Sequence, residues 1–203
     1  KIVYFRVDED CPQRLFLLFL LVRLVVVIHK RTQTGNSMCA MKEITTEEIS
    51  RAVARMAVDA CCLLPDDVVA GLARARQEES SPIGQAILEQ LQENAALARA
   101  ESMPICQDTG LAVVFASVGQ DVRIVGGDFE SAIHEGVRRG YTQGYLRKSC
   151  VAEPLFERKN TGDNTPAVIH ARIVPGDALR LRLAPKGAGS ENKSLLRMLV
   201  PAD

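Results

Sequence analysis

The sequence predicts an α+β fold, in which an N-terminal helical layer is followed by a mixed β-sheet with covering helices. Apolar residues recur at helical spacing through much of residues 45–101. After residue 110 the pattern changes to short apolar or alternating runs that are bounded by Gly, Pro and Asp, which is typical of strands. A chain of 203 residues of which 47% are hydrophobic can bury a sizeable core.

Three helices are expected in the helical layer. Residues 45–48 (TTEE) supply a capping hydroxyl and a Glu three residues later, so the first helix begins there and ends near Leu64. Pro65 and the two acidic residues after it start a second helix that ends at about Glu79. Ser81 opens the third helix. The apolar stripe that we expect this helix to bury consists of Ile83, Ala86, Ile87, Leu91, Ala95 and Ala98. We interpret the three helices as a cap or a dimer-forming layer without catalytic groups.

The second half of the chain predicts strands and one more helix. Residues 111–118 form a continuous apolar run with branched side chains, which indicates a strand covered on both faces. A second strand is expected at 122–125, followed by a helix from 129 to about 144. Residues 167–174 show a partly alternating pattern of apolar and polar side chains, which predicts a strand. Residues 178–183 alternate apolar and basic side chains, as a half-exposed strand does.

Residues 1–40 differ from the rest of the chain. The apolar run over residues 15–28 contains one Arg, and it is short for a membrane span, which needs about 20 residues. Acidic residues before this run do not fit a secretory signal. We interpret residues 1–40 as a non-native leader, either upstream sequence translated in frame or an artefact of expression, with Met41 or Met38 as the natural start. A disordered or apolar, membrane-anchoring arm is the alternative.

Composition and cysteine spacing argue against one class of partner and favour a reducing compartment. Lys plus Arg balance Asp plus Glu at 25 each, and the sequence has no basic tail or aromatic-interleaved basic stripe. Nucleic acid is therefore not an expected partner. The six cysteines include no CxxC pair and no zinc-ligand spacing, which argues against a disulfide scaffold or a zinc ribbon, so we expect reduced thiols and a cytoplasmic location. With residues 1–40 interpreted as a leader, we expect no membrane partner.

The segment 104–110 (PICQDTG) is the strongest candidate for a functional site. It places a thiol, an amide, a carboxylate and a hydroxyl at a helix-to-strand junction, on Cys106, Gln107, Asp108 and Thr109. From these residues alone two interpretations stay open. Cys106 is either a small apolar residue packed near a turn or a ligand, and Asp108 either caps the following turn or exchanges a proton.

Two other polar features have structural interpretations. Residues 160–165 (NTGDNT) are dense in side chains that form turns and bond to the nearby backbone. We interpret this run as the support of a long connection. His170 lies in a strand pattern, and we interpret it as a core or interface residue.

Three later segments strengthen the hypothesis about residues 104–110: residues 136–149, 159–167 and 185–194. In this order and spacing, the four segments resemble the alpha subunit of class I fumarate hydratase, an iron-sulfur hydro-lyase family that also includes L-tartrate dehydratase. The resemblance runs from about Met41 to Asp203. It implies the N-terminal domain fold of that family and the reversible hydration of fumarate to L-malate, a step of the tricarboxylic acid cycle.

The resemblance also implies roles for single residues. Cys106 would be one of three cysteines that hold a [4Fe-4S] cluster, in which one iron stays open as a Lewis acid. Gln107 and Asp108 match a substrate-contacting pair, with Asp108 as the candidate catalytic acid or base. Arg147 matches an arginine that binds a substrate carboxylate. The residues that match a glycine-rich substrate loop are Gly189, Asn192 and Lys193.

In the family, the other two cluster cysteines lie after the glycine-rich loop, whereas this chain stops at Asp203. Residues 41–203 are therefore expected to be a C-terminally truncated alpha-type catalytic domain that is inactive alone. A beta subunit or a C-terminal domain is the expected partner, within an oligomer that acts on a dicarboxylate. Two alternatives stay open, namely an L-tartrate dehydratase alpha subunit and a non-catalytic truncated paralogue or assembly module.

Overall fold

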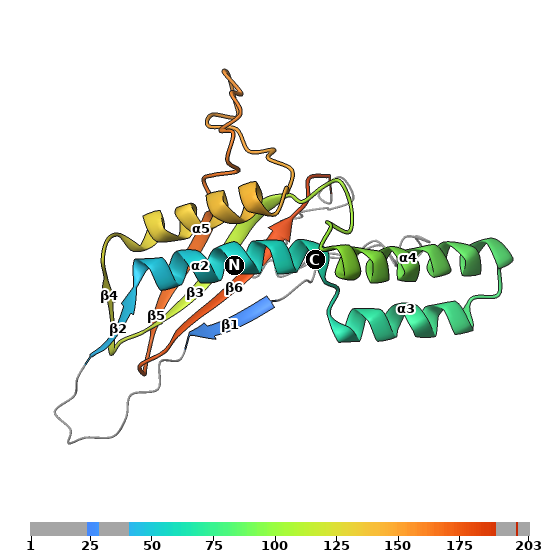
Figure 1. Ribbon diagram of the computed structural model, residues 1–203, viewed down its shortest axis with the longest axis horizontal. Coiled ribbons are helices and arrows are strands. Elements are labelled where there is room, and N and C mark those ends of the chain that lie inside the picture. The colour runs from blue at the N-terminus through green and yellow to red at the C-terminus, as the bar shows by residue number, and fades with distance from the viewer. Residues whose placement is uncertain (1–23, 29–40, 190–197, 199–203) are drawn as a thin grey trace.

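The structure is a computed structural model that describes residues 24–28, 41–189 and 198. In these residues, three helices come before most of the strands of a small mixed sheet, which confirms the α+β prediction (Figure 1). Asn192, Lys193 and most of the segment 1–40 lie outside the described residues, so the predictions for them stay predictions. No helix in the described part of the chain is both long enough and apolar enough to cross a membrane.

The helical layer consists of α2 (Thr46–Cys62), α3 (Asp66–Glu78) and α4 (Pro82–Glu101). α2 begins at the predicted capping box, in which Thr45 Oγ1 accepts from Glu48 N and the Glu48 carboxylate accepts from Thr45 N. α3 and α4 form a hairpin that extends away from the sheet (Figure 1). This hairpin has a small core of its own, made by Leu64, Val68, Leu72 and Leu88.

The buried face of α4 differs from the prediction. Leu88 and Ala98 are buried, with Leu91 and Ala95 packed partly against the same core. Ile83 is 75% exposed and Ile87 is 50% exposed. The apolar residues of this helix are spread over more of its circumference than one neighbouring helix covers, so the prediction that Ile83, Ala86 and Ile87 are buried is wrong.

The main sheet has the strand order β1 (Leu24–Ile28), β6 (Leu179–Lys186), β3 (Leu111–Gly119) and β5 (Val168–Val174). β3 is antiparallel to β6 and parallel to β5, so the sheet is mixed as predicted. β2 (Lys42–Thr45) and β4 (Val122–Val125) form a separate parallel pair. Neither β1 nor β2, the two strands that precede α2, was predicted.

α2 and α5 (Phe129–Gln143) lie side by side on one face of the main sheet (Figure 1). Gly136 of α5 lies so close to α2 that an added Cβ would be 2.6 Å from the Ser50 carbonyl oxygen. The two helices and the inner sides of β3 and β6 form the main core. The largest side chains buried in it include Met56, Ile133, Tyr141, Leu179, Leu181 and Leu183.

The opposite face of the sheet is open in the described part of the chain. Phe115 of β3 is 47% exposed and stacks on His170 of β5, with 5.1 Å between the ring centroids. Arg180 and Arg182 of β6 are also exposed there, as the alternating pattern predicted. No described helix covers this face, so the expected two-sided covering of residues 111–118 is not found. His170 likewise lies on the sheet surface.

Candidate active site

The segment between α4 and β3 is held firmly by the helical layer. Ile105 N donates a hydrogen bond to the Cys61 carbonyl at the end of α2, over 2.9 Å. The Ile105 carbonyl accepts from Asn94 Nδ2 of α4 over 2.8 Å. These two bonds fix the residue that precedes Cys106.

Cys106 presents an accessible thiol. Its side chain is exposed, and its Sγ lies 3.4 Å from the Asp108 carbonyl oxygen. Cys61 and Cys62 are buried and Cys150 is partly buried. Burial, with the nearby thiols Cys62 and Cys106, raises the pKa of Cys61 to about 12, and burial also raises the pKa of Cys62 and Cys150. Those three thiols stay protonated at neutral pH. Among the described cysteines, Cys106 is the one whose side chain is exposed.

The Asp108 carboxylate bonds to two backbone segments. Its Oδ1 accepts from Gly110 N over 3.0 Å, which is the turn-capping geometry. Its Oδ2 accepts from Ala188 N over 3.0 Å, in the loop that follows β6. A Cβ on Gly187 would lie 2.9 Å from the same oxygen, so this approach depends on glycine. The carboxylate thus joins the turn to the first residues of the predicted glycine-rich loop.

Arg147 lies beside the same turn. Its carbonyl oxygen accepts from Thr109 Oγ1 over 3.2 Å, and its side chain is exposed. Within the described residues, no ion pair includes Arg147. Arg138 and Arg139, by contrast, are both paired with Glu135. Of these three arginines, Arg147 is therefore the one available to an anionic ligand.

Two buried polar side chains that were not predicted for the site connect its segments. The Tyr141 hydroxyl lies 2.8 Å from the Thr109 carbonyl oxygen and 3.2 Å from that of Gly110. Burial raises the pKa of Tyr141, so the hydroxyl stays a neutral donor. Asn164 is fully buried and bonds both to Gly110 and to the backbone just after Arg147. Both residues lie in segments that carry the family resemblance, Tyr141 in 136–149 and Asn164 in 159–167, but no site role was predicted for either.

The structure therefore brings together most of the predicted site residues that it describes. Cys106, Gln107 and Asp108 share one turn, on which Gln107 is exposed. The Arg147 backbone bonds to this turn through Thr109, and the loop that leads to Gly189 bonds to it through Asp108. The roles of these residues in chemistry stay predictions.

The donor set fits one corner of an iron-sulfur cluster. Among the described residues, no group of three or more His, Cys, Asp or Glu side chains is placed to hold a metal ion. Cys106 offers one accessible thiol on a fixed turn, and thiolates are the ligands that such clusters require. Further ligands would have to come from outside the described residues.

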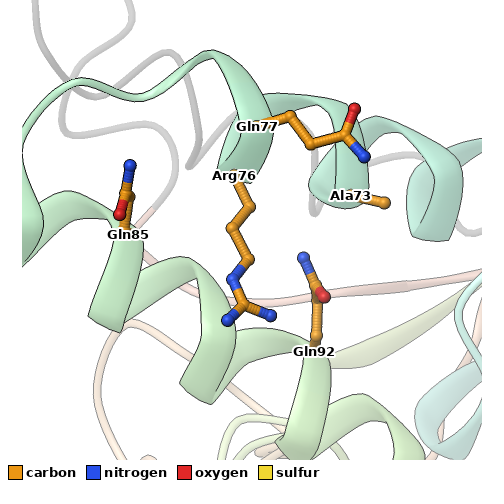
Figure 2. A pocket seen from close by; sticks show the side chains of 5 residues that line it. All are labelled: Ala73, Arg76, Gln77, Gln85 and Gln92. Carbon is orange, nitrogen blue, oxygen red and sulfur yellow. The ribbon is translucent and has the colours of Figure 1, made fainter.

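A separate pocket of about 360 Å³ lies between α3 and α4 (Figure 2). Figure 2 shows Arg76 and Gln92 extending into the space between the two helices. Arg76 is paired with Glu89 over 2.6 Å, and Gln92 Nε2 donates to the Leu72 carbonyl over 3.1 Å. The polar side chains that line this pocket thus bond to groups of the same helical hairpin, and none of the predicted site residues lines the pocket.

Fold and site together define an α+β protein in which an accessible thiol and a carboxylate share one fixed turn, and the backbone of an arginine that pairs with no described acidic residue is bonded to the same turn. This combination suits a metal centre that binds a small anion. The profile of the family described as "Fumarate hydratase (Fumerase)" matches residues 50–203, and the chain belongs to this family.

The relatives that match this chain are named either as tartrate dehydratase subunits or as fumarate hydratases. A "Putative L(+)-tartrate dehydratase subunit alpha" of Methanocaldococcus jannaschii is 34% identical over 166 residues, which cover 77% of this chain and 56% of that protein. The aerobic class I fumarate hydratase of Escherichia coli K12 is 37% identical over 122 residues, which cover 60% of this chain and 22% of that enzyme. Fumarate hydratase 2 of Leishmania major is 35% identical over 132 residues, which cover 64% and 23%. The chain thus spans about half the length of the first relative and under a quarter of the other two.

Proposed function

We propose that this chain supplies the Cys106–Asp108 part of the active site of an iron-sulfur hydro-lyase, which adds water reversibly to fumarate to give L-malate. The observation that carries the proposal is the turn that holds an accessible thiol beside a carboxylate and is bonded to the Arg147 segment. Family membership and the names of the relatives support the reaction class.

Cys106 would hold a [4Fe-4S] cluster together with cysteines from outside the described residues. When bound, the cluster supplies a Lewis-acidic iron that polarises a hydroxyl group. The Arg147 guanidinium binds one substrate carboxylate through its planar fork of donors. Gln107, the backbone of the loop at Gly189 and, beyond it, Asn192 and Lys193 bind the rest of the dicarboxylate.

Asp108 is the proposed acid or base. The backbone N–H groups of Gly110 and Ala188 orient its two carboxylate oxygens, one each. Each oxygen keeps acceptor capacity beyond its single backbone bond, so the group can still exchange a proton with a bound hydroxyl.

We also propose how the chain is assembled into the complete enzyme. Residues 41–203 would form an alpha-type domain that works with a beta subunit or a C-terminal domain, within an oligomer. The accessible thiol of Cys106 supports a reducing compartment, and we place the enzyme in the cytoplasm.

L-tartrate dehydration is the second candidate. The match to the tartrate dehydratase subunit covers 77% of this chain, compared with 60% for the aerobic fumarate hydratase. Both reactions remove water from a hydroxy-diacid, so the same side chains serve either substrate.

The test uses the complete enzyme, purified without oxygen, and assays L-malate and L-tartrate side by side. We expect Cys106→Ser to lose iron and activity, whereas Cys150→Ser, a matched change at a partly buried thiol, keeps both. The 203-residue chain alone should hold no stoichiometric cluster after reconstitution. Full iron content and activity in Cys106→Ser would contradict the proposal.

A further inference from the structure

Asn164 occupies an unusual position for a residue in a turn-rich loop. Its side chain is 0% exposed, and its backbone is in the left-handed region with φ of 63°. Asn tolerates this conformation better than most residues. A fully buried amide must satisfy its donor and acceptor inside the protein, so its bonds show what it holds together.

The amide of Asn164 connects two segments. Its Nδ2 donates to the Gly110 carbonyl over 3.0 Å. Its Oδ1 accepts from Ser149 N over 2.8 Å and from Cys150 N over 3.2 Å. One planar group thus spans the turn that contains Asp108 and the segment that begins at Arg147.

Tyr141 strengthens the same connection from α5. Its buried hydroxyl lies 2.8 Å from the Thr109 carbonyl oxygen and 3.2 Å from the Gly110 carbonyl oxygen. α5 ends at Gln143, shortly before Arg147. The bonds of the hydroxyl therefore also fix the end of α5, from which the Arg147 segment continues. The Asn164 amide and the Tyr141 hydroxyl form an internal clamp, and we use this name for the two groups below.

The clamp is anchored independently of the site. The neighbouring Asp163 accepts from Arg138 Nε of α5 over 2.8 Å and from Thr165 N over 3.0 Å. These bonds hold residue 164 in place whether or not a ligand is bound. The distance between the Asp108 turn and the Arg147 segment is therefore set by the protein interior rather than by the ligand.

We propose that Asn164, with Tyr141, is a positioning residue that sets the spacing between the Asp108 turn and Arg147 and so determines the affinity of the site for a dicarboxylate. The inference rests on the proposed function. The two groups would contact opposite parts of one small diacid, and a shift of about 1 Å between them is enough to lose much of the binding.

The chain offers a matched pair of substitutions. Asn164→Asp keeps the size of the side chain and its acceptor for Ser149 and Cys150, but it replaces the donor to the Gly110 carbonyl with a second oxygen. Asn160→Asp makes the same change in the same loop. Asn160 Nδ2 donates to the Lys148 carbonyl over 2.9 Å and makes no described bond to residues 108–110.

In the complete enzyme, we expect Asn164→Asp to raise KM for the dicarboxylate about 10-fold or more, because Arg147 binds its carboxylate equally in ground and transition states. We also expect a lower kcat, because Asp108 lies on the turn that moves. Asn160→Asp should leave KM within about 2-fold of the unsubstituted enzyme, since the turn keeps its bonds. A merely structural role for Asn164 would instead lower the active fraction, and therefore kcat, at constant KM. Iron content is measured in each variant so that cluster loss is recognised.

Amide hydrogen exchange provides a readout without turnover. Gly110 N bonds to Asp108 Oδ1, and we expect its exchange to become about 10-fold faster or more in Asn164→Asp but not in Asn160→Asp. An unchanged KM with full iron content, or an unchanged Gly110 exchange rate, would overturn the inference. If Asn164→Asp does not fold, Tyr141→Phe removes only a hydroxyl from the clamp and must raise KM as well, and an unchanged KM there also overturns it. If the unsubstituted enzyme has neither activity, the proposed function fails, and the exchange rate still decides the positioning role.

Discussion

Gly110 lies at the point where the candidate site turn enters β3, and it has no room for a side chain. Its φ is 61°, and a Cβ would be 2.2 Å from the Lys186 carbonyl oxygen of β6. We expect Gly110→Ala to lower the free energy of unfolding of the chain by about 3 kcal/mol, through left-handed strain together with overpacking. Urea unfolding followed by circular dichroism measures this change.

Gly162→Ala is the control for the strain alone. Gly162 has a φ of 77°, but nothing lies within 4 Å of its added Cβ. The control should cost about 1 kcal/mol. Equal losses in the two variants would show that the close approach of Gly110 to β6 is not what requires glycine there.

At the scale of single residues, the sequence revealed the site residues that are neighbours in the chain. Cys106, Gln107 and Asp108 are contiguous, so their shared turn needed no knowledge of tertiary contacts. Asn164 contacts Gly110 across 54 residues, and its burial depends on how the loop packs against the core. A turn-rich run predicts bonds to its own backbone, and nothing in such a run indicates a partner that far away.

Packing between α2 and α5 depends on the small residues of α5. A Cβ on Gly136 would lie 2.6 Å from both the Ser50 carbonyl oxygen and Val53 Cβ. We expect Gly136→Ala to destabilise the chain by about 2 kcal/mol, because overpacking against a backbone atom exceeds the gain in helix propensity. Thermal unfolding at fixed pH measures the change.

A glycine in α4 provides the comparison. The added Cβ of Gly84 would meet only the side chain of Glu79, which can move away. Gly84→Ala should therefore stay within about 1 kcal/mol of the unsubstituted chain or stabilise it. A Gly136→Ala chain as stable as this control would mean that α5 can move away from α2 at little cost.

The elements themselves were predictable where their signals are local. The start of α2 was predicted because the capping box lies within four residues. β2 was missed, since its four residues form a strand only by pairing with β4 far along the chain. Ile83 and Ile87 were assigned to the wrong environment for a similar reason, because helical periodicity shows which residues share a face but not which face meets a neighbour.

At the scale of the molecule, the class of fold followed from the order of the elements, whereas the strand order did not. β6 lies between β1 and β3, and β5 pairs with β3 on its other side. The open sheet face was predicted for β6 from its alternating basic residues, but not for β3 next to Phe115. A continuous apolar run such as 111–118 is typical of two-sided burial, but in the described residues helices cover only one side.

The stability of the whole chain should depend on Asp163, because this carboxylate connects the loop before β5 to α5. Burial raises the pKa of Asp163, but hydrogen bonds from the Thr165 hydroxyl and N–H and from Arg138 outweigh burial and lower it to about 2. A carboxyl group whose pKa is lower in the folded state stabilises that state above its unfolded pKa, which is ordinarily 3.8. The contribution is lost as the pH falls through the folded value of about 2.

We therefore expect Asp163→Asn to lower the free energy of unfolding at neutral pH by about 1 kcal/mol, after allowance for solvent screening of this partly exposed pair. The difference from the unsubstituted chain should be complete above about pH 4 and should shrink toward zero near pH 2, because the carboxyl group becomes neutral in both states. Asp177→Asn, an exposed change in the turn between β5 and β6, should leave the free energy of unfolding at neutral pH within about 0.5 kcal/mol of the unsubstituted chain. Urea unfolding at a series of pH values measures all three chains. A difference between the Asp163→Asn and unsubstituted chains that stays constant down to pH 2 would show that the charge of Asp163 is not the stabilising feature, and the bonds of its neutral side chain would then account for the loss.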